Sequence, residues 1–174
     1  SAFGRFSEDD VLKMAALSSK EASMDAIDLA IINYSKSKKI MLDNCERISY
    51  TPFSPKNKRT EAEAKIDGEN FRIYKGAPQT IMELCSGTDD NIKDAVEKTI
   101  GGFSDKGYRT IAAAASKDTD SCPEFMGLLA IADPPRDDSK RMISEIKKLG
   151  IRPIMLTGDS IAIARKISGD VGIG

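Results

Sequence analysis

The chain has 174 residues, 40% of them hydrophobic and 30% charged, so it is a globular protein of one or two domains rather than a disordered or fibrous one. Its 26 basic and 27 acidic side chains leave a net charge of −1, which gives no general attraction for nucleic acid. The absence of histidine excludes His-based acid–base catalysis and metal sites that need imidazole.

Two helices are predicted in the N-terminal part. Ser7 and Asp10 have the spacing of a capping box, and apolar residues at helical spacing follow as far as about Ser19. A second helix is predicted after Ser23, because its apolar residues recur at positions i, i+3, i+4 and i+7. These residues are Ile27, Ala30, Ile31 and Tyr34.

The middle of the chain has the patterns of an antiparallel sheet. Residues 45–53 alternate and end between prolines, which is typical of an extended segment. Residues 59–66 and 70–75 are predicted to form a hairpin through Asp67-Gly68, and 110–116 another strand. A short helix is expected from Pro78, and a longer one is expected to end at Gly101-Gly102.

The hydrophobic pattern of the sequence changes near residues 120–125, where we expect a domain boundary. Residues 126–132 are continuously apolar, as in a strand buried on both faces, and a helix capped by Asp137 or Asp138 and ended by Gly150 follows. Residues 151–156 are predicted to be a second buried strand, followed by a helix to about Ile167. This βαβ pattern is half of a doubly wound fold, so we expect the chain to be a fragment.

Cysteines and apolar runs place further limits on the protein. Cys45, Cys85 and Cys122 contain no C-x-x-C pair, which argues against a zinc knuckle and indicates a reducing compartment. No apolar run approaches the roughly 18 to 20 residues that cross a bilayer, and no signal peptide is evident.

Several segments have the chemistry of a phosphate or nucleotide site, and each has a purely structural alternative. Lys75 and Gly76 end a strand, where an ammonium lies beside backbone that a ligand can approach, or where a common turn begins. Phe53, between prolines and near Lys58, suits stacking on a base, or closes the core. Asp28 could meet the amino group of a base or favour its helix N-terminus.

The C-terminal candidates follow the predicted buried strands. Arg109 could clamp a phosphate or be an ordinary surface residue. Asp133-Pro134-Pro135-Arg136 follows one strand and has the stiffness of a hinge. Thr157-Gly158-Asp159 precedes a helix whose N-terminal amides favour a phosphoryl group, or whose end Thr157 or Asp159 simply caps.

Taken together and in order, these motifs resemble the cytoplasmic region of P-type cation-transporting ATPases. The wording of Asp25-Ala26-Ile27-Asp28 and Tyr50-Thr51-Pro52-Phe53 is most similar to the plasma-membrane proton-ATPase branch. The resemblance implies an α+β fold, with an antiparallel sheet flanked by helices in a nucleotide-binding domain (1–124) and a partial α/β dehalogenase-like βαβ segment of the phosphorylation domain (125–174).

The resemblance also implies residue roles. Phe53 would stack on adenine, Lys58 and Lys75 would line the pocket, Gly76 would make room and Asp28 would face the adenine amino group. The remaining roles concern the phosphates and the hinge. Arg109, Thr157, Gly158 and Asp159 would lie near the phosphates or the transferred phosphoryl group, and Asp133 and Arg136 would belong to the interdomain hinge.

The sequence also departs from the family pattern. Pro55 stands where many calcium-pump relatives have arginine, and Asp28 is one methylene shorter than their glutamate. The Asp-Lys-Thr-Gly-Thr segment with the phosphorylated aspartate and the Mg²⁺-binding segment are not in the sequence, so we expect ATP and ADP binding without turnover. The partners would be the missing phosphorylation, actuator and transmembrane domains of a membrane-embedded pump, with this chain a soluble monomer on its cytoplasmic side.

Two other functions are compatible with the sequence. A complete dehalogenase-like phosphohydrolase with a cap domain would need a nucleophilic aspartate after a buried strand. Asp118-Thr119-Asp120 is the nearest match, but its carboxylates come two residues late and Cys122 stands where threonine is expected. A non-catalytic domain whose basic loop binds an anionic partner would show no preference for adenine.

Overall fold

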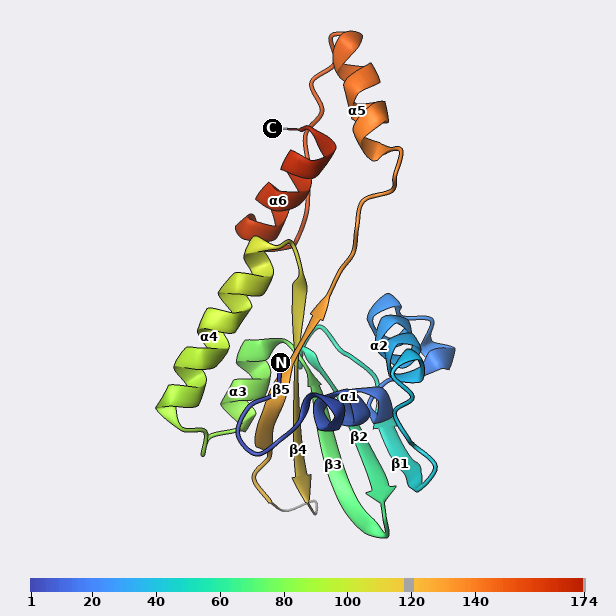
Figure 1. The fold of residues 1–174 in the computed structure, drawn as a ribbon, viewed down its shortest axis with the longest axis vertical. Coiled ribbons are helices and arrows are strands. Elements are labelled where there is room, and N and C mark those ends of the chain that lie inside the picture. The colour runs from blue at the N-terminus through green and yellow to red at the C-terminus, as the bar shows by residue number, and fades with distance from the viewer. Residues whose placement is uncertain (118–120, 174) are drawn as a thin grey trace. The chain divides into compact units, whose positions relative to one another are not determined.

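The computed structural model describes residues 1–117 and 121–173 (Figure 1). The Asp118-Thr119-Asp120 segment therefore lies outside the described residues. The chain divides into two compact units. The first consists of Ser1–Val96 and Thr110–Leu129, and the second of Glu97–Arg109 and Ala130–Gly174.

A five-stranded sheet organises the first unit. Its strands lie in the order of the chain: β1 (Cys45–Thr51), β2 (Arg59–Ile66), β3 (Glu69–Gly76), β4 (Arg109–Lys117) and β5 (Glu124–Ile131). Strands β2 and β3 form the predicted hairpin, in which Asp67 and Gly68 both have positive φ, as a two-residue turn requires. The predicted α+β class with an antiparallel sheet is confirmed.

Helices α1 (Glu8–Leu17), α2 (Ala26–Ser37) and α3 (Pro78–Leu84) belong to the same unit, with a 3₁₀ turn, η1 (Glu21–Ser23), between the first two. The capping box of Ser7 and Asp10 is formed as predicted, and the Asp25 side chain caps α2 by accepting from Ile27 and Asp28. Helix α1 packs its apolar face on alanine-rich strands. The cluster consists of Val11, Leu17, Ala64, Ile66, Ile73, Ala113, Ala115 and Met126.

Helix α4 (Asp90–Asp105) continues through Gly101 and Gly102, so the prediction that it ends there is wrong. Both glycines lie in open space on the exposed side of the helix, where they weaken the helix without stopping it. The chain turns instead at Gly107, whose φ of +80° is favourable only for glycine and whose N–H donates to Ser104 O at 2.9 Å.

The second unit contains α5 (Ser139–Lys148) and α6 (Ile161–Val171). Gly150 follows α5 with φ +77°, as predicted for its C-terminal end. The strand expected over residues 151–156 is not formed, so the βαβ pattern lacks its second strand. An extended segment needs a neighbouring strand to pair its backbone groups, and here Ile154 and Leu156 are 79% and 95% exposed.

Strand β5 runs through the boundary predicted between residues 124 and 125 and lies beside β4. The division into domains at that point stays a prediction. Among the described residues, no helix combines the length and the apolar character that crossing a membrane requires.

Candidate functional site

A buried ion pair joins strand β3 to helix α2. Lys75 Nζ donates to Asp28 Oδ1 at 2.5 Å and to Ser19 Oγ at 2.5 Å. The two charged side chains are only 4% and 6% exposed. A charge in such a place is tolerated because its partner and further polar groups replace the water it has lost.

The other oxygen of Asp28 is also occupied. Asp28 Oδ2 accepts from Lys20 N at 2.9 Å, from Tyr50 Oη at 3.2 Å and from Ser23 Oγ at 3.3 Å. The carboxylate therefore ties together the loop after α1, the helix α2 and the strands β1 and β3. A ligand that hydrogen-bonds to this carboxylate must displace one of these donors.

Titration behaviour follows from this environment. Burial by itself raises the pKa of Asp28, but the hydrogen bonds from Lys75, Lys20 and Tyr50 together with the Lys75 charge bring the pKa below its usual value. Burial, the charge of Asp28 and the hydrogen bond to it raise the pKa of Tyr50 to about 12. Burial lowers the pKa of Lys75, and Asp28 opposes that effect. Tyr50 therefore stays a phenol donor at neutral pH.

Arg47 completes this network, which sequence reasoning missed. Its guanidinium donates to Ser19 O at 2.5 Å and lies 5.4 Å from the centre of the Tyr50 ring. Three residues apart on a regular strand, Arg47 and Tyr50 would point to opposite faces. A shift in register between Arg47 and Ser49 pairs them with Ala64 and Ala62, so they share one face. Alternation alone could not have found this.

A turn brings the loop after β1 against the end of β3. Phe53 is 58% exposed. Lys58 N donates to Ser54 O at 2.7 Å, and Ala77 N donates to Lys58 O at 3.1 Å. Lys58 adopts a left-handed backbone with φ 51°. The exposed Phe53 ring and the exposed Lys58 thus belong to a loop whose backbone is fixed beside Gly76 and Ala77.

Gly76 is required by this close approach of two backbones. A Cβ at this position would lie 2.4 Å from Lys58 O and 2.8 Å from Arg59 Cα. No side chain fits there unless the strands β2 and β3 separate. Gly76 therefore has a structural role in strand packing. Its predicted role, making room for a ligand, stays a prediction.

In the second unit, three predicted residues come together. Arg109 Nη2 donates to Asp159 Oδ1 at 2.6 Å, and Thr157 Oγ1 donates to Asp159 Oδ2 at 3.0 Å. The hydrogen bond from Arg109 lowers the pKa of Asp159, with burial opposing it and Thr157 adding to it. Arg109 is half-exposed, so part of its positive charge faces solvent.

The remaining predicted residues lie outside these groups. Asp133 and Arg136 are exposed on the segment between β5 and α5, and Arg136 O accepts from Ser139 N at 2.9 Å where that helix begins. Gly158 is surrounded by open space. Helix α6 is capped by Ser160, whose Oγ accepts from Ile163 N. The alternative prediction, that Thr157 or Asp159 caps this helix, is therefore wrong.

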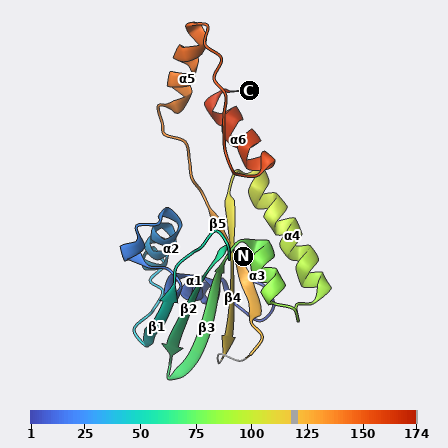
Figure 2. The same cartoon turned by 180° about the vertical axis from the view of Figure 1, so that it is seen from behind.

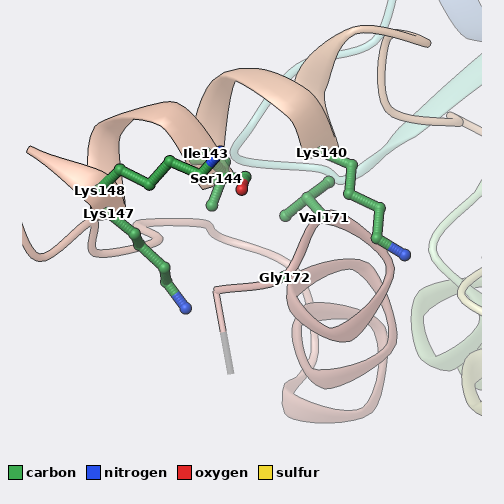
Figure 3. Close-up of a pocket in the computed structure, with 7 residues that line it drawn as sticks. All are labelled: Lys140, Ile143, Ser144, Lys147, Lys148, Val171 and Gly172. Atoms are coloured by element: carbon green, nitrogen blue, oxygen red, sulfur yellow. The ribbon is translucent and has the colours of Figure 1, made fainter.

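A hollow of about 440 Å³ in the second unit is lined by none of the predicted residues (Figure 3). Its walls come from α5 and the end of α6: Lys140, Ile143, Ser144, Lys147, Lys148, Val171 and Gly172. Within the described parts of the chain, no three Cys, Asp or Glu side chains come together as a metal site needs. No magnesium site is assigned to these residues.

Comparison with known proteins gives two kinds of match. Residues 15–174 match the model of the haloacid dehalogenase-like hydrolases. The chain is 40% identical over 175 residues to a putative cation-transporting ATPase of Methanocaldococcus jannaschii, covering 99% of this chain and 21% of that protein. It is 34% identical over 175 residues to a probable plasma membrane ATPase of Dictyostelium discoideum, covering 96% and 16%. The chain thus spans 21% and 16% of the lengths of these two relatives.

Removing one partner of the buried pair is expected to destabilise the first unit strongly. Asp28→Asn leaves the Lys75 ammonium buried without its counter-charge, so we expect a loss of about 3 to 5 kcal/mol of unfolding free energy in urea. Replacing both partners, Asp28→Leu with Lys75→Met, removes the unpaired charge and is expected to cost less than Asp28→Asn, although the Lys20 N–H and the Tyr50 hydroxyl lose their acceptor. As a control, Asp170→Asn removes the exposed Lys166–Asp170 pair and should change stability by less than about 1 kcal/mol.

The effect of Asp28→Asn should depend on pH. The pKa of Asp28 is lower in the folded state than its ordinary value of 3.8, so its contribution is complete above that pH and is lost as the pH falls through the folded pKa. Unfolding curves of the two proteins should therefore converge in acid. An equal difference at neutral and strongly acidic pH would contradict the ionised pair.

The close approach at Gly76 gives a separate stability prediction. Gly76→Ala should lower the unfolding free energy by about 1 to 3 kcal/mol, because the new methyl group overlaps the Lys58 carbonyl. Gly102→Ala, inside α4 with open space around it, should instead be neutral or stabilise by about 0.5 to 1 kcal/mol. Equal effects of the two substitutions in urea unfolding would refute the steric argument.

Proposed function

The chain belongs to the haloacid dehalogenase-like hydrolase family and is related along its length to cation-transporting ATPases, and we propose that it carries the adenine-nucleotide site of a P-type pump. One observation carries this proposal: the end of the Phe53–Lys58 loop is held beside Gly76 and Ala77 by the hydrogen bond from Ala77 N to Lys58 O. The two motifs that the resemblance assigns to the nucleotide are thereby neighbours.

Phe53 is proposed to stack on the adenine ring. Its side chain is largely exposed on a loop whose backbone is already ordered, so binding a base requires little further loss of conformational freedom. Stacking of a base on an aromatic ring contributes about 1 to 3 kcal/mol. The contact involves only the base, which ATP and ADP share.

Lys58 and Lys75 are proposed to differ in how they meet a nucleotide. The exposed Lys58 ammonium is accessible to a phosphate at once. Lys75 is neutralised by Asp28 and buried, so it can reach a phosphate only after that pair opens. Asp28 likewise can face an adenine amino group only if one of its hydrogen-bond donors is displaced.

In the second unit, we assign phosphate recognition to Arg109, Thr157 and Gly158. The half-exposed guanidinium supplies charge, and Thr157-Gly158 precedes a helix whose N-terminal amides favour anions. Asp159 holds Arg109 in place, while Asp133 and Arg136 are proposed as hinge residues. Mg²⁺ use, transport of a cation such as the proton, and a position on the cytoplasmic side of a membrane-embedded pump belong to the same proposal for the parent protein.

We further propose that this chain, as a monomer, binds ATP without hydrolysing it, because its 174 residues contain neither the Asp-Lys-Thr-Gly-Thr segment nor the Mg²⁺-binding segment. A phosphatase assay with Mg²⁺ tests this point. Release of phosphate would favour the alternative, a complete phosphohydrolase of the same family.

Nucleotide titrations followed by amide NMR test the binding site. With one stacking ring and few accessible cations, we expect a Kd on the order of 1 mM, with shifts centred on Phe53, Lys58 and Gly76. Phe53→Ala should weaken ATP and ADP equally, by roughly 5- to 150-fold.

Tyr34→Ala is the matched control, because Tyr34 is an aromatic residue of similar exposure (54%) on α2. It should leave both affinities unchanged. A selective loss of ATP in Phe53→Ala, or equal losses in both variants, would contradict the assignment of Phe53 to the base.

A further inference from the structure

We propose that Cys85 and Cys122 are a redox-sensitive pair that forms a disulfide on mild oxidation. Cys85 directly follows α3, and Cys122 lies just before β5, so 36 residues lie between them in the sequence. Both belong to the first unit. In two opposite views α3 lies next to β5 (Figures 1 and 2).

The Cys122 sulfur lies against the backbone of Cys85. Cys122 Sγ is 3.7 Å from Leu84 O and 3.6 Å from Ser86 Oγ, the neighbours of Cys85 on either side. The Leu84 carbonyl is part of the same planar peptide group as the Cys85 nitrogen. The Cys122 sulfur therefore lies one peptide group from Cys85, and the two cysteines are close neighbours in the first unit.

The two thiols have complementary properties. Cys122 is exposed, so a reagent in solution reaches it, whereas Cys85 is 1% exposed and is shielded from direct attack. Burial, with the nearby Cys122 adding to it, raises the pKa of the Cys85 thiol to about 12. Cys85 is also held in place, because its carbonyl accepts from Thr88 N and Thr88 Oγ1 at 2.9 Å and 2.8 Å.

A small disulfide such as glutathione disulfide supplies the oxidant. The Cys122 thiolate attacks one sulfur of glutathione disulfide, which forms a mixed disulfide and releases one glutathione thiolate. The Cys85 sulfur then attacks Cys122 Sγ, and its proton passes to the glutathione thiolate that leaves as the second glutathione. Two protein thiols are oxidised by two electrons, and one glutathione disulfide is reduced to two thiols.

The product would tie the end of α3 to the connection before β5. Helix α3 begins at Pro78, directly after the Gly76-Ala77 segment on which the Phe53–Lys58 loop rests. The link therefore fixes the element that follows that segment. Cys45, on β1, takes no part.

The test is to equilibrate the full chain with glutathione disulfide, quench it with acid, and measure intact mass and thiol count. We expect two of the three thiols to disappear, a mass lower by two hydrogen atoms without added glutathione, and one proteolytic peptide pair joined through Cys85 and Cys122. A stable glutathione adduct on Cys122, three remaining thiols, or a link through Cys45 would overturn the proposal.

Matched variants separate the steps. Cys45→Ser should behave like the unmodified chain, and Cys85→Ser should stop at the glutathione adduct of Cys122. Cys122→Ser changes an exposed side chain and should fold normally, as circular dichroism would show, while Cys85 stays reduced. Oxidation of Cys85 in folded Cys122→Ser would refute the order of attack. None of these readouts depends on nucleotide binding.

Discussion

The ion pair between Lys75 and Asp28 is the constraint around which the first unit is arranged. A buried ammonium and carboxylate are stable only with nearly complete hydrogen bonding, and here the donors and acceptors come from the loop after α1, from α2, from β1 and from β3. Elements far apart in the chain are thus held in one geometry. The network therefore fixes the position of α2 relative to β1 and β3.

The residues proposed to bind the nucleotide differ in how accessible they are. Lys75 and Asp28 face each other, while Phe53 and Lys58 present an exposed ring and an exposed cation on a loop fixed against Gly76. Of the residues proposed for the site, Phe53 and Lys58 are therefore accessible, whereas Lys75 and Asp28 are buried and neutralise each other. A nucleotide that contacts Lys75 or Asp28 would have to compete with their salt bridge, which would lower its affinity.

Local patterns in the sequence predicted most of the elements. The capping box at Ser7, the Asp67-Gly68 hairpin and the glycine after α5 depend on neighbouring residues, and each is formed. The family resemblance, carried by short motifs in a fixed order, is confirmed by relatives that match nearly the whole chain. Such features need no knowledge of distant contacts.

The remaining features depend on contacts between residues that are far apart in the sequence. The pairing of Lys75 with Asp28 joins residues 47 positions apart, and the shared face of Arg47 and Tyr50 depends on a register shift that strict alternation cannot predict. The strand expected over residues 151–156 is absent because apolar character alone does not provide a pairing partner. Composition and periodicity fix which segments are able to form helices and strands, whereas burial and backbone pairing decide which charges meet and which side chains stay accessible.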